Sequence, residues 1–323
     1  MSAPTTEAAP ADDARGDPGD ADAGGAALAA IRAVAERMSE FEPAAEADEP
    51  DAVHQLRTHV RRLRSLLAAY APLFDPSATR MLRRRLRELG RELGAVRDLE
   101  VRIQVAEHAL EAAGERDPAE DVAGSREQFA ALRERLVDAQ VEAHRLAHAR
   151  FVERQRMPRA EARRAALAEF LRAPRFAPDA AGPPREVLGA LVEREARRAV
   201  KRAKRLRSDP EIAALHAVRK AGRRLRYTAE SVAAPPIAMF GTDAMRLAKA
   251  GERLHDVLGD HRDEVLFAEH VRRAGAHAAH AGEPAAAFEA LAGAADRRAA
   301  RHLRELDDAV VELRHAAAAW RRR

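Results

Sequence analysis

The chain contains no cysteine among its 323 residues, which excludes disulfide bonds, thiolate nucleophiles and cysteine-ligated zinc sites. A chain without cysteine suits a reducing compartment. No apolar run approaches the roughly 20 residues that a membrane-spanning helix needs. The first residues also lack the basic-then-apolar layout of a signal peptide. We therefore expect a cytoplasmic protein that does not bind membranes.

Aromatic residues and lysines are scarce. Aromatics make up 4% of the chain, with one Trp and two Tyr, which argues against recognition of single-stranded nucleic acid by base stacking. Of the 56 basic residues only four are lysines, and the others are arginines. Codon usage in a GC-rich genome favours arginine and alanine alike. The ratio of arginine to lysine therefore says little about function.

Charge is distributed unevenly along the chain. Residues 1–50 contain three basic and 12 acidic residues, which gives a net charge of −9. Residues 51–323 contain 53 basic and 40 acidic residues, which gives +13, so the formal total of +4 conceals a basic body that follows an acidic segment. This asymmetry makes polyanions the first class of partner to consider.

The spacing of apolar residues predicts an all-α protein. Hydrophobic residues make up 46% of the chain and charged residues 33%, and no segment shows sustained alternation of polar and apolar residues. We expect one short helix at 26–41 within an otherwise disordered acidic tail. Further helices are expected at about 51–73, 77–96, 99–114, 126–156, 159–172, 185–207, 210–232, 238–258, 261–279 and 284–321.

Two blocks of sequence occur twice. The block HQLRTHVRRLR at 54–64 matches HAVRKAGRRLR at 216–226, 162 residues later. The block LGAVRD at 93–98 matches LGDHRD at 258–263, 165 residues later. Because order and separation are preserved, we interpret the chain as a duplicated helical unit whose halves pack with approximate two-fold symmetry. The Asp that ends each copy of the second block would cap a following helix or neutralise an arginine of a neighbouring helix.

Each copy of the first block carries a basic stripe beside an apolar one. From Val53 to Leu67, apolar residues recur three and four positions apart, which predicts a core-facing helix surface. The basic positions have the same spacing and follow by one residue, about 100° around the helix. The two stripes are His54, Arg57, Arg61 and Arg64 in the first copy, and His216, Arg219, Arg223 and Arg226 in the second.

Neither stripe has an acidic residue nearby on its own helix. None is present from Val53 to Phe74 or from Ile212 to Ala229. Like charges three and four positions apart on a helix repel, so the opposite charge must come from other helices or from a ligand. Arginine makes bidentate, charge-assisted bonds to phosphate oxygens. We therefore interpret the stripes as the lining of a groove for an extended polyanion, with steeply salt-dependent binding.

Other basic residues are candidates for the same groove. The segment 194–226 contains 13 basic and three acidic residues. Position 84 on the next helix and its duplicate at 249 are both basic. In the second copy, Gly222 replaces Val60 and would let a neighbouring helix approach closely. The additional candidates are Arg84, Lys249, Arg198, Arg202 and Arg205.

Taken together, these motifs resemble the CHAD domain, the conserved histidine α-helical domain. The residues that carry the resemblance are His54-x-x-Arg57, LGxxRD at 93–98, and LHxxRK followed by RRLRYxxE at 215–230. The resemblance covers about residues 50–321. It implies two pseudo-symmetric four-helix bundles around a central basic groove that binds inorganic polyphosphate, and it implies association with polyphosphate granules. We expect halves at about 51–207 and 208–323, after an acidic tail at 1–50.

Some members of this family are fused to a CYTH-type triphosphatase. Such a module needs β-strands and an ExExK stretch, and the nearest sequence here, Glu40-Phe-Glu42, is followed by Pro43 without a strand pattern. We therefore expect a stand-alone binding domain that is not an enzyme and needs no cofactor. His54 and His216 are expected to bind a polyanion more tightly when protonated, as the pH falls through about 6–7.

Three rival interpretations remain open. His144 and His148 are four positions apart, and His277 and His280 three, which are spacings that metal sites use, but no carboxylate partner is evident in the sequence. The second rival is an enzyme in which a stripe histidine accepts a phosphoryl group or acts as a general base. No acid is placed to orient such a histidine, and no Walker glycine loop is present. A groove for phosphates would also accept DNA or RNA, although no base-reading motif is visible.

Overall fold

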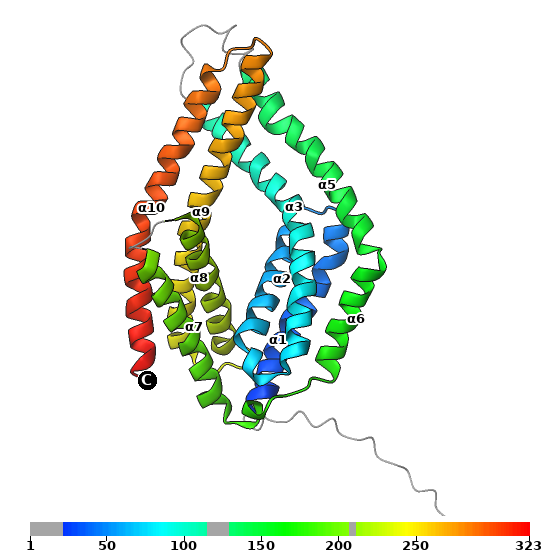
Figure 1. Cartoon of the computed structure of the whole chain (residues 1–323), viewed down its shortest axis with the longest axis vertical. Helices are drawn as coiled ribbons and strands as arrows, with labels where there is room; N and C mark the ends of the chain where they lie inside the picture. The colour runs from blue at the N-terminus through cyan, green and yellow to red at the C-terminus, as the bar shows by residue number, and fades with distance from the viewer. Residues whose placement is uncertain (1–21, 115–128, 207–210) are drawn as a thin grey trace, which may run out of the picture.

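The computed structural model describes residues 22–114, 129–206 and 211–323, and within them the chain is almost entirely helical (Figure 1). The described part has no β-strand, only an isolated bridge between Phe74 and Phe176. The all-α prediction is confirmed. The α-helices are α1 (Ala23–Glu46), α2 (Ala52–Ala69), α3 (Pro76–Gly114), α5 (Ala139–Gln155), α6 (Pro158–Arg172), α7 (Pro184–Leu206), α8 (Ile212–Ala233), α9 (Gly241–His280) and α10 (Ala286–Arg321).

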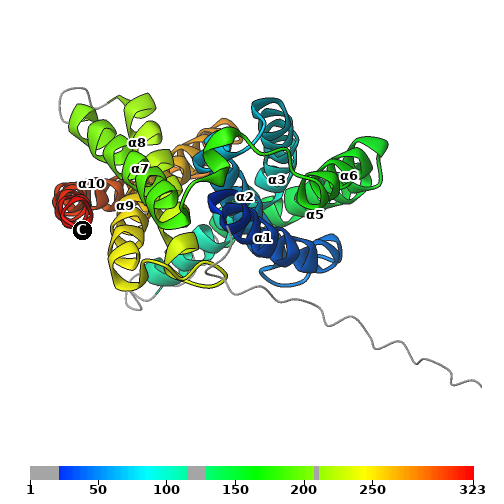
Figure 2. The same cartoon turned by 90° about the horizontal axis from the view of Figure 1, so that it is seen from below.

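The helices form two groups, visible on the two sides of Figure 1 and from below in Figure 2. Helices α1, α2, α3, α5 and α6 make up one group, and α7, α8, α9 and α10 the other. The groups meet where α2 packs against α8, where α1 packs against α7 and where α3 reaches α9. At the first junction Arg62 of α2 forms an ion pair with Glu230 of α8. The two helices that carry the basic stripes are therefore neighbours.

The apolar stripes form the core. Every apolar residue of the predicted face of α2 is at most 1% exposed, and Val218 and Leu225 of α8 are buried to the same extent. Burial of each such side chain stabilises the fold by about 1.5–3 kcal/mol. Since the basic stripe follows the apolar stripe by one residue, a buried apolar face fixes the direction of the basic one.

Helix α1 corrects the expected tail. It runs from Ala23 to Glu46, where a short helix at 26–41 was expected, and Ile31, Met38 and Ala45 are buried against the rest of the protein. It packs on α2. Residues 23–46 thus belong to the folded body, because their apolar spacing outweighs their acidic composition. The remainder of the expected tail, residues 1–21, lies outside the described residues.

Helix α7 corrects the expected boundary between the halves. It packs chiefly against α8 and α10, and buries Leu188, Val192 and Ala199. A division at 207/208 would separate α7 from these partners. The packing instead places the change from one group to the other between α6 and α7, in the segment 173–183 that we expected to be a loop.

Two predicted helix breaks are wrong. Helix α3 continues through Arg97 and Asp98, and α9 continues through Gly259 and Asp260. No proline follows either pair, and a single glycine costs a helix only about 1 kcal/mol. The break predicted near Pro158 is confirmed, since α5 ends at Gln155 and α6 begins at Pro158.

Helices α8 and α9 approach most closely at two facing glycines. A Cβ atom added to Gly222 would lie 2.8 Å from the carbonyl oxygen of Gly251, and one added to Gly251 would lie 2.8 Å from that of Gly222. The prediction that Gly222 permits a close helix approach is confirmed. As for membranes, none of the described helices is both long enough and apolar enough to cross one.

Candidate functional site

Both basic stripes line a single cleft. It lies between α2 and α8 and is bordered by residues of α3 and α9. All eight stripe positions contribute to it, namely His54, Arg57, Arg61, Arg64, His216, Arg219, Arg223 and Arg226. We refer to this hollow as the basic cleft. The fold therefore brings together two segments that are 162 residues apart in the sequence.

The middle of the basic cleft has positive charge without a paired acid. Among the described residues, no ion pair joins Arg61, Arg64 or Arg223 to a carboxylate, and the Nη2 of Arg61 donates only to the hydroxyl of Thr58, at 3.1 Å. Burial, followed by the charge of Arg61, lowers the pKa of Arg223 to about 9. Burial is also the main cause that lowers the pKa of Arg61 and of Arg64. These groups remain cationic at neutral pH.

Three buried guanidinium nitrogens in the cleft have no hydrogen-bond partner among the described residues. They are the Nε atoms of Arg61, Arg219 and Arg223. A buried donor without an acceptor costs about 1–3 kcal/mol, and more when it is charged. Such groups are rare in native structures and need an explanation. An anionic ligand in the cleft would offset this cost by neutralising the charge of the three guanidinium groups.

Two arginines of the stripes are partly neutralised by acids of other helices and, for Arg226, also by an acid of its own helix. Arg57 lies 3.2 Å from the Oδ1 of Asp98. Arg226 lies 2.8 Å from Glu230 and 2.8 Å from Glu252. Burial lowers the pKa of Arg226, but its bond to Glu230 and the charges of both glutamates outweigh burial and raise it.

The duplicated LGxxRD block holds the first arginine of each stripe. A Cβ atom at Gly94 would lie 3.6 Å from the Nη2 of Arg57, and a Cβ atom at Gly259 would lie 3.2 Å from that of Arg219. The glycines thus leave room for a guanidinium from the neighbouring helix. The prediction that the Asp of this block neutralises a neighbouring arginine is confirmed for Asp98. Asp263 also lines the cleft, and the charge of Arg219 opposes the burial that raises its pKa.

Both stripe histidines are biased toward the neutral form. Burial lowers the pKa of His54, and the positive charge of Arg97 lowers it further. Burial and then the charge of Lys220 lower the pKa of His216. Neither imidazole has a carboxylate within hydrogen-bond distance among the described residues. These two histidines therefore offer charge and hydrogen bonds to an anion, without a carboxylate to orient either imidazole.

A third histidine in the basic cleft was not predicted. His255 of α9 is 9% exposed, its Nδ1 lies 3.0 Å from the Oδ1 of Asp256, and its Nε2 is buried without a partner. Burial lowers its pKa to about 4, and Arg219 and Arg223 add to the effect against the opposing bond to Asp256. The corresponding residues of the first copy, Gly90 and Arg91, differ, so the internal repeat carries no signal for this pair. Arg97, Arg102, Tyr227 and Arg262 also line the cleft and were not among the candidates.

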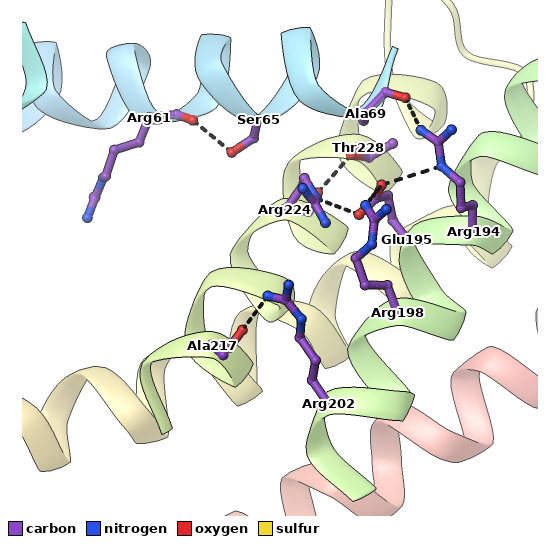
Figure 3. A network of polar contacts seen from close by, with 10 residues as sticks. All are labelled: Arg61, Ser65, Ala69, Arg194, Glu195, Arg198, Arg202, Ala217, Arg224 and Thr228. Atoms are coloured by element: carbon purple, nitrogen blue, oxygen red, sulfur yellow. Dashed lines mark hydrogen bonds and ion pairs between the residues drawn. The ribbon is translucent and has the colours of Figure 1, made fainter. Parts of the chain in front are cut away.

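The remaining predicted candidates lie outside the basic cleft. Arg84 is exposed on α3, Arg205 is exposed on α7, and Lys249 lines a separate surface hollow between α9 and α10. Arg198 and Arg202 belong to a network around α7 and α8, shown in Figure 3. Sequence spacing places basic residues on a helix face but does not show which helix that face meets.

The network of Figure 3 is centred on Glu195, which is 1% exposed. Its carboxylate accepts bonds from Arg224 and from Arg198, the latter at 2.8 Å. Arg202 donates to the carbonyl oxygen of Ala217 at 3.0 Å. The side chain of Arg61 points away from this network in Figure 3. A buried carboxylate with several partners is a structural element of α7 and α8, separate from the cleft.

Comparisons with known proteins agree with this architecture. The chain resembles a solved CHAD domain from the plant Ricinus communis, with a TM-score of 0.65 and 25% identity over 92% of this chain and 93% of that one. It also resembles the structure of PptA from Streptomyces chartreusis, with a TM-score of 0.65 and 20% identity over 91% and 99% of the two chains, which shows the fold alone.

Two curated sequences are related along most of the chain. Uncharacterized proteins of two Mycobacterium tuberculosis strains, MT2285 and Rv2226, are each 30% identical over 88% of this chain. The chain spans 54% of their length. The profile of the CHAD domain matches residues 29–272, a range that begins within α1. This protein belongs to the CHAD domain family.

Proposed function

We propose that the protein binds inorganic polyphosphate in the basic cleft without altering it chemically. The observation that carries the proposal is the meeting of Arg61, Arg219 and Arg223 from two helices at one cleft, each with a buried Nε atom that has no partner among the described residues. Each guanidinium can make two charge-assisted bonds to phosphate oxygens. A chain of phosphates offers such oxygens repeatedly, as the stripes offer donors.

The length of the stripes favours an extended ligand over a single phosphate ion. Each stripe covers eleven residues, from His54 to Arg64 and from His216 to Arg226, or about 15 Å of helix. A lone phosphate would contact only part of one stripe and would leave the remaining arginines repelling each other. An extended polyanion would neutralise both stripes at once.

The same proposal accounts for the internal repeat. Arg57, Gly94 and Asp98 in one group of helices correspond to Arg219, Gly259 and Asp263 in the other. The Arg and Asp of both triplets line the cleft, and each glycine lies against its Arg. We attribute this correspondence to duplication of a four-helix unit, with the two units related by pseudo-symmetry across the basic cleft. Association with polyphosphate granules in the cytoplasm follows as part of the proposal.

The test compares two double variants of equal charge. Arg61→Gln/Arg223→Gln removes the two acid-free arginines in the middle of the cleft, and Arg84→Gln/Lys249→Gln removes two exposed cations outside it. Because a hydrogen bond to a charged group contributes about 1.5–3 kcal/mol, we expect the first variant to lose at least about 100-fold in affinity for long-chain polyphosphate. The control should lose little. Fluorescence anisotropy at two salt concentrations measures both affinity and its salt dependence.

The thermal midpoint of each variant separates loss of binding from loss of folding. Removal of Arg61 and Arg223 relieves like-charge repulsion and should leave that midpoint equal or higher. Equal affinity of the two variants overturns the proposal. Displacement of polyphosphate by duplex DNA or RNA at equal phosphate concentration would point to a nucleic-acid ligand instead. Shortening of the chains in the presence of Mg²⁺ or Mn²⁺ would show an enzyme.

A further inference from the structure

A second group of polar side chains meets at the turn between α1 and α2, outside the lining of the basic cleft. It consists of Asp48 from the turn, Glu100 from α3 and His144 from α5, and one ligand atom of each lies within 4.8 Å of the others. The Nε2 of His144 is 3.5 Å from the Oε1 of Glu100 and 3.9 Å from the Oδ1 of Asp48. Three elements distant in the sequence thus direct an imidazole and two carboxylates to one point.

These separations suit a shared cation. Zinc binds nitrogen and carboxylate oxygen at about 2.0–2.2 Å, so two ligands of a tetrahedral site lie about 3.3–3.5 Å apart. The two separations from His144 are equal to this or a few tenths of an ångström longer, and the two carboxylate oxygens lie within 4.8 Å of each other. His144 and Glu100 are mostly buried, with side chains 16% and 19% exposed, while Asp48 is 43% exposed and leaves a path for an ion.

The oxygens of Glu100 are already divided between two tasks. Its Oε2 accepts a bond from Arg97 at 2.8 Å, and its Oε1 faces His144. An outer partner of this kind orients a carboxylate toward a metal. His148, one turn after His144, lies 3.7 Å from the Oδ1 of Asp48, but the same Nε2 is 2.9 Å from the carbonyl oxygen of Ala45 and is engaged there. We therefore do not count it among the ligands.

The other closely spaced pair of histidines makes a useful contrast. His277 and His280 are exposed near the end of α9, and no group of carboxylates meets them among the described residues. Both pairs have spacings compatible with a metal, but only the pair on α5 has acids brought to it by the fold. The pair on α5 differs from the pair on α9 because three elements of the fold converge beside it, and the spacing of the histidines does not distinguish them.

We propose that Asp48, Glu100 and His144 bind a divalent transition-metal ion such as Zn²⁺, with water completing the coordination. An imidazole with two carboxylates favours such an ion over Mg²⁺, which prefers oxygen ligands alone. The ion would tie the α1–α2 turn to α3 and α5. Through Glu100 and Arg97, which lines the basic cleft, it would also add positive charge close to the cleft.

Zinc binding to the full chain, measured by isothermal titration calorimetry in phosphate-free buffer without polyphosphate, tests the proposal. We expect one site per chain and a thermal midpoint that rises by a few degrees when zinc is present in excess. His144→Gln and Glu100→Gln should each weaken zinc binding at least about 100-fold, because loss of a ligand exceeds the 10–100-fold effect of losing an outer partner. His277→Gln/His280→Gln is the matched control and should bind zinc as wild type does.

The outcomes separate this site from the basic cleft. If wild type shows no stoichiometric site, or if zinc binding is lost in the 277/280 variant and kept in His144→Gln, the metal site does not exist. Thermal melts without zinc show whether each variant is folded, and a folded variant that keeps its zinc affinity also overturns the proposal. Failure of polyphosphate binding would leave these results unaffected, because no polyphosphate is present.

Discussion

The contact between Gly222 and Gly251 determines how closely α8 and α9 approach beside the basic cleft. Replacement of Gly222 by alanine would place a methyl carbon 2.8 Å from the carbonyl oxygen of Gly251 and 3.4 Å from the Cβ of Leu254. A Cβ atom at Gly251 would lie 2.8 Å from the oxygen of Gly222 and 2.9 Å from the amide nitrogen of Arg226. The closest atoms belong to the backbone, so no rotation of a side chain relieves either clash. The helices must separate.

Two opposing effects set the magnitude. Alanine in a helix interior is favoured over glycine by about 1 kcal/mol. Overpacking of a tight contact costs about 1–3 kcal/mol. Gly222→Ala should therefore lower the free energy of unfolding by up to about 2 kcal/mol. The control is Gly293→Ala on α10, where the nearest atom is the flexible Nη1 of Arg297 at 3.5 Å, and it should be neutral or stabilising by up to about 1 kcal/mol.

Urea unfolding followed by circular dichroism measures both variants. The double variant Gly222→Ala/Gly251→Ala adds a sharper criterion, since one separation of α8 from α9 relieves both clashes. Its cost should be smaller than the sum of the two single costs. A Gly222→Ala protein as stable as Gly293→Ala would refute the reasoning, and so would strict additivity of the two changes at the contact.

Two further predictions concern pH. The pKa values of His54 and His216 are lowered in the free protein, and a bound polyanion raises them. Polyphosphate affinity should therefore rise as the pH falls through the pKa values of the bound protein, and level off below the pKa values of the free protein. Titrations that show a flat affinity from pH 5.5 to 8 would contradict this. The pKa of His255 is about 4 in the folded protein against 6.5 unfolded, so its contribution to stability is present above pH 6.5 and is lost as pH falls toward 4. From pH 7 to pH 4.5, the free energy of unfolding should fall by about 2 kcal/mol less in His255→Gln than in wild type, as measured by urea denaturation.

Periodicity in the sequence was sufficient to predict the helices and faces that build the basic cleft. Val60 and Leu63 lie in the core as predicted, which fixes the direction of Arg61 and Arg64 beside them. Duplication then indicated that a second helix would present an equivalent face. These inferences succeed because they depend on local spacing and on burial of an apolar stripe.

The errors arise where long-range packing decides the structure. The acidic composition of residues 23–46 hid a helix whose apolar face contacts α2. Arg198 lies in a basic segment, yet its partner is the buried Glu195 one turn away. Likewise, no repeat marked His255, and no spacing placed Asp48 beside His144. Which helix face meets which partner depends on the fold as a whole, so local patterns cannot supply it.

The arginines of the two stripes differ in whether an acidic residue compensates their charge. Apart from Glu230, which pairs with Arg226 on α8, the stripe helices lack acids around the stripes, so the remaining opposite charge has to come from elsewhere. Other elements supply it at the ends, where Asp98 pairs with Arg57 and Glu252 with Arg226. In the middle, Arg61 and Arg223 have no such partner among the described residues and lose part of their hydration through burial. The unliganded protein therefore keeps its largest uncompensated charge where both helices face one cleft, and a polyanion would gain the most binding free energy there.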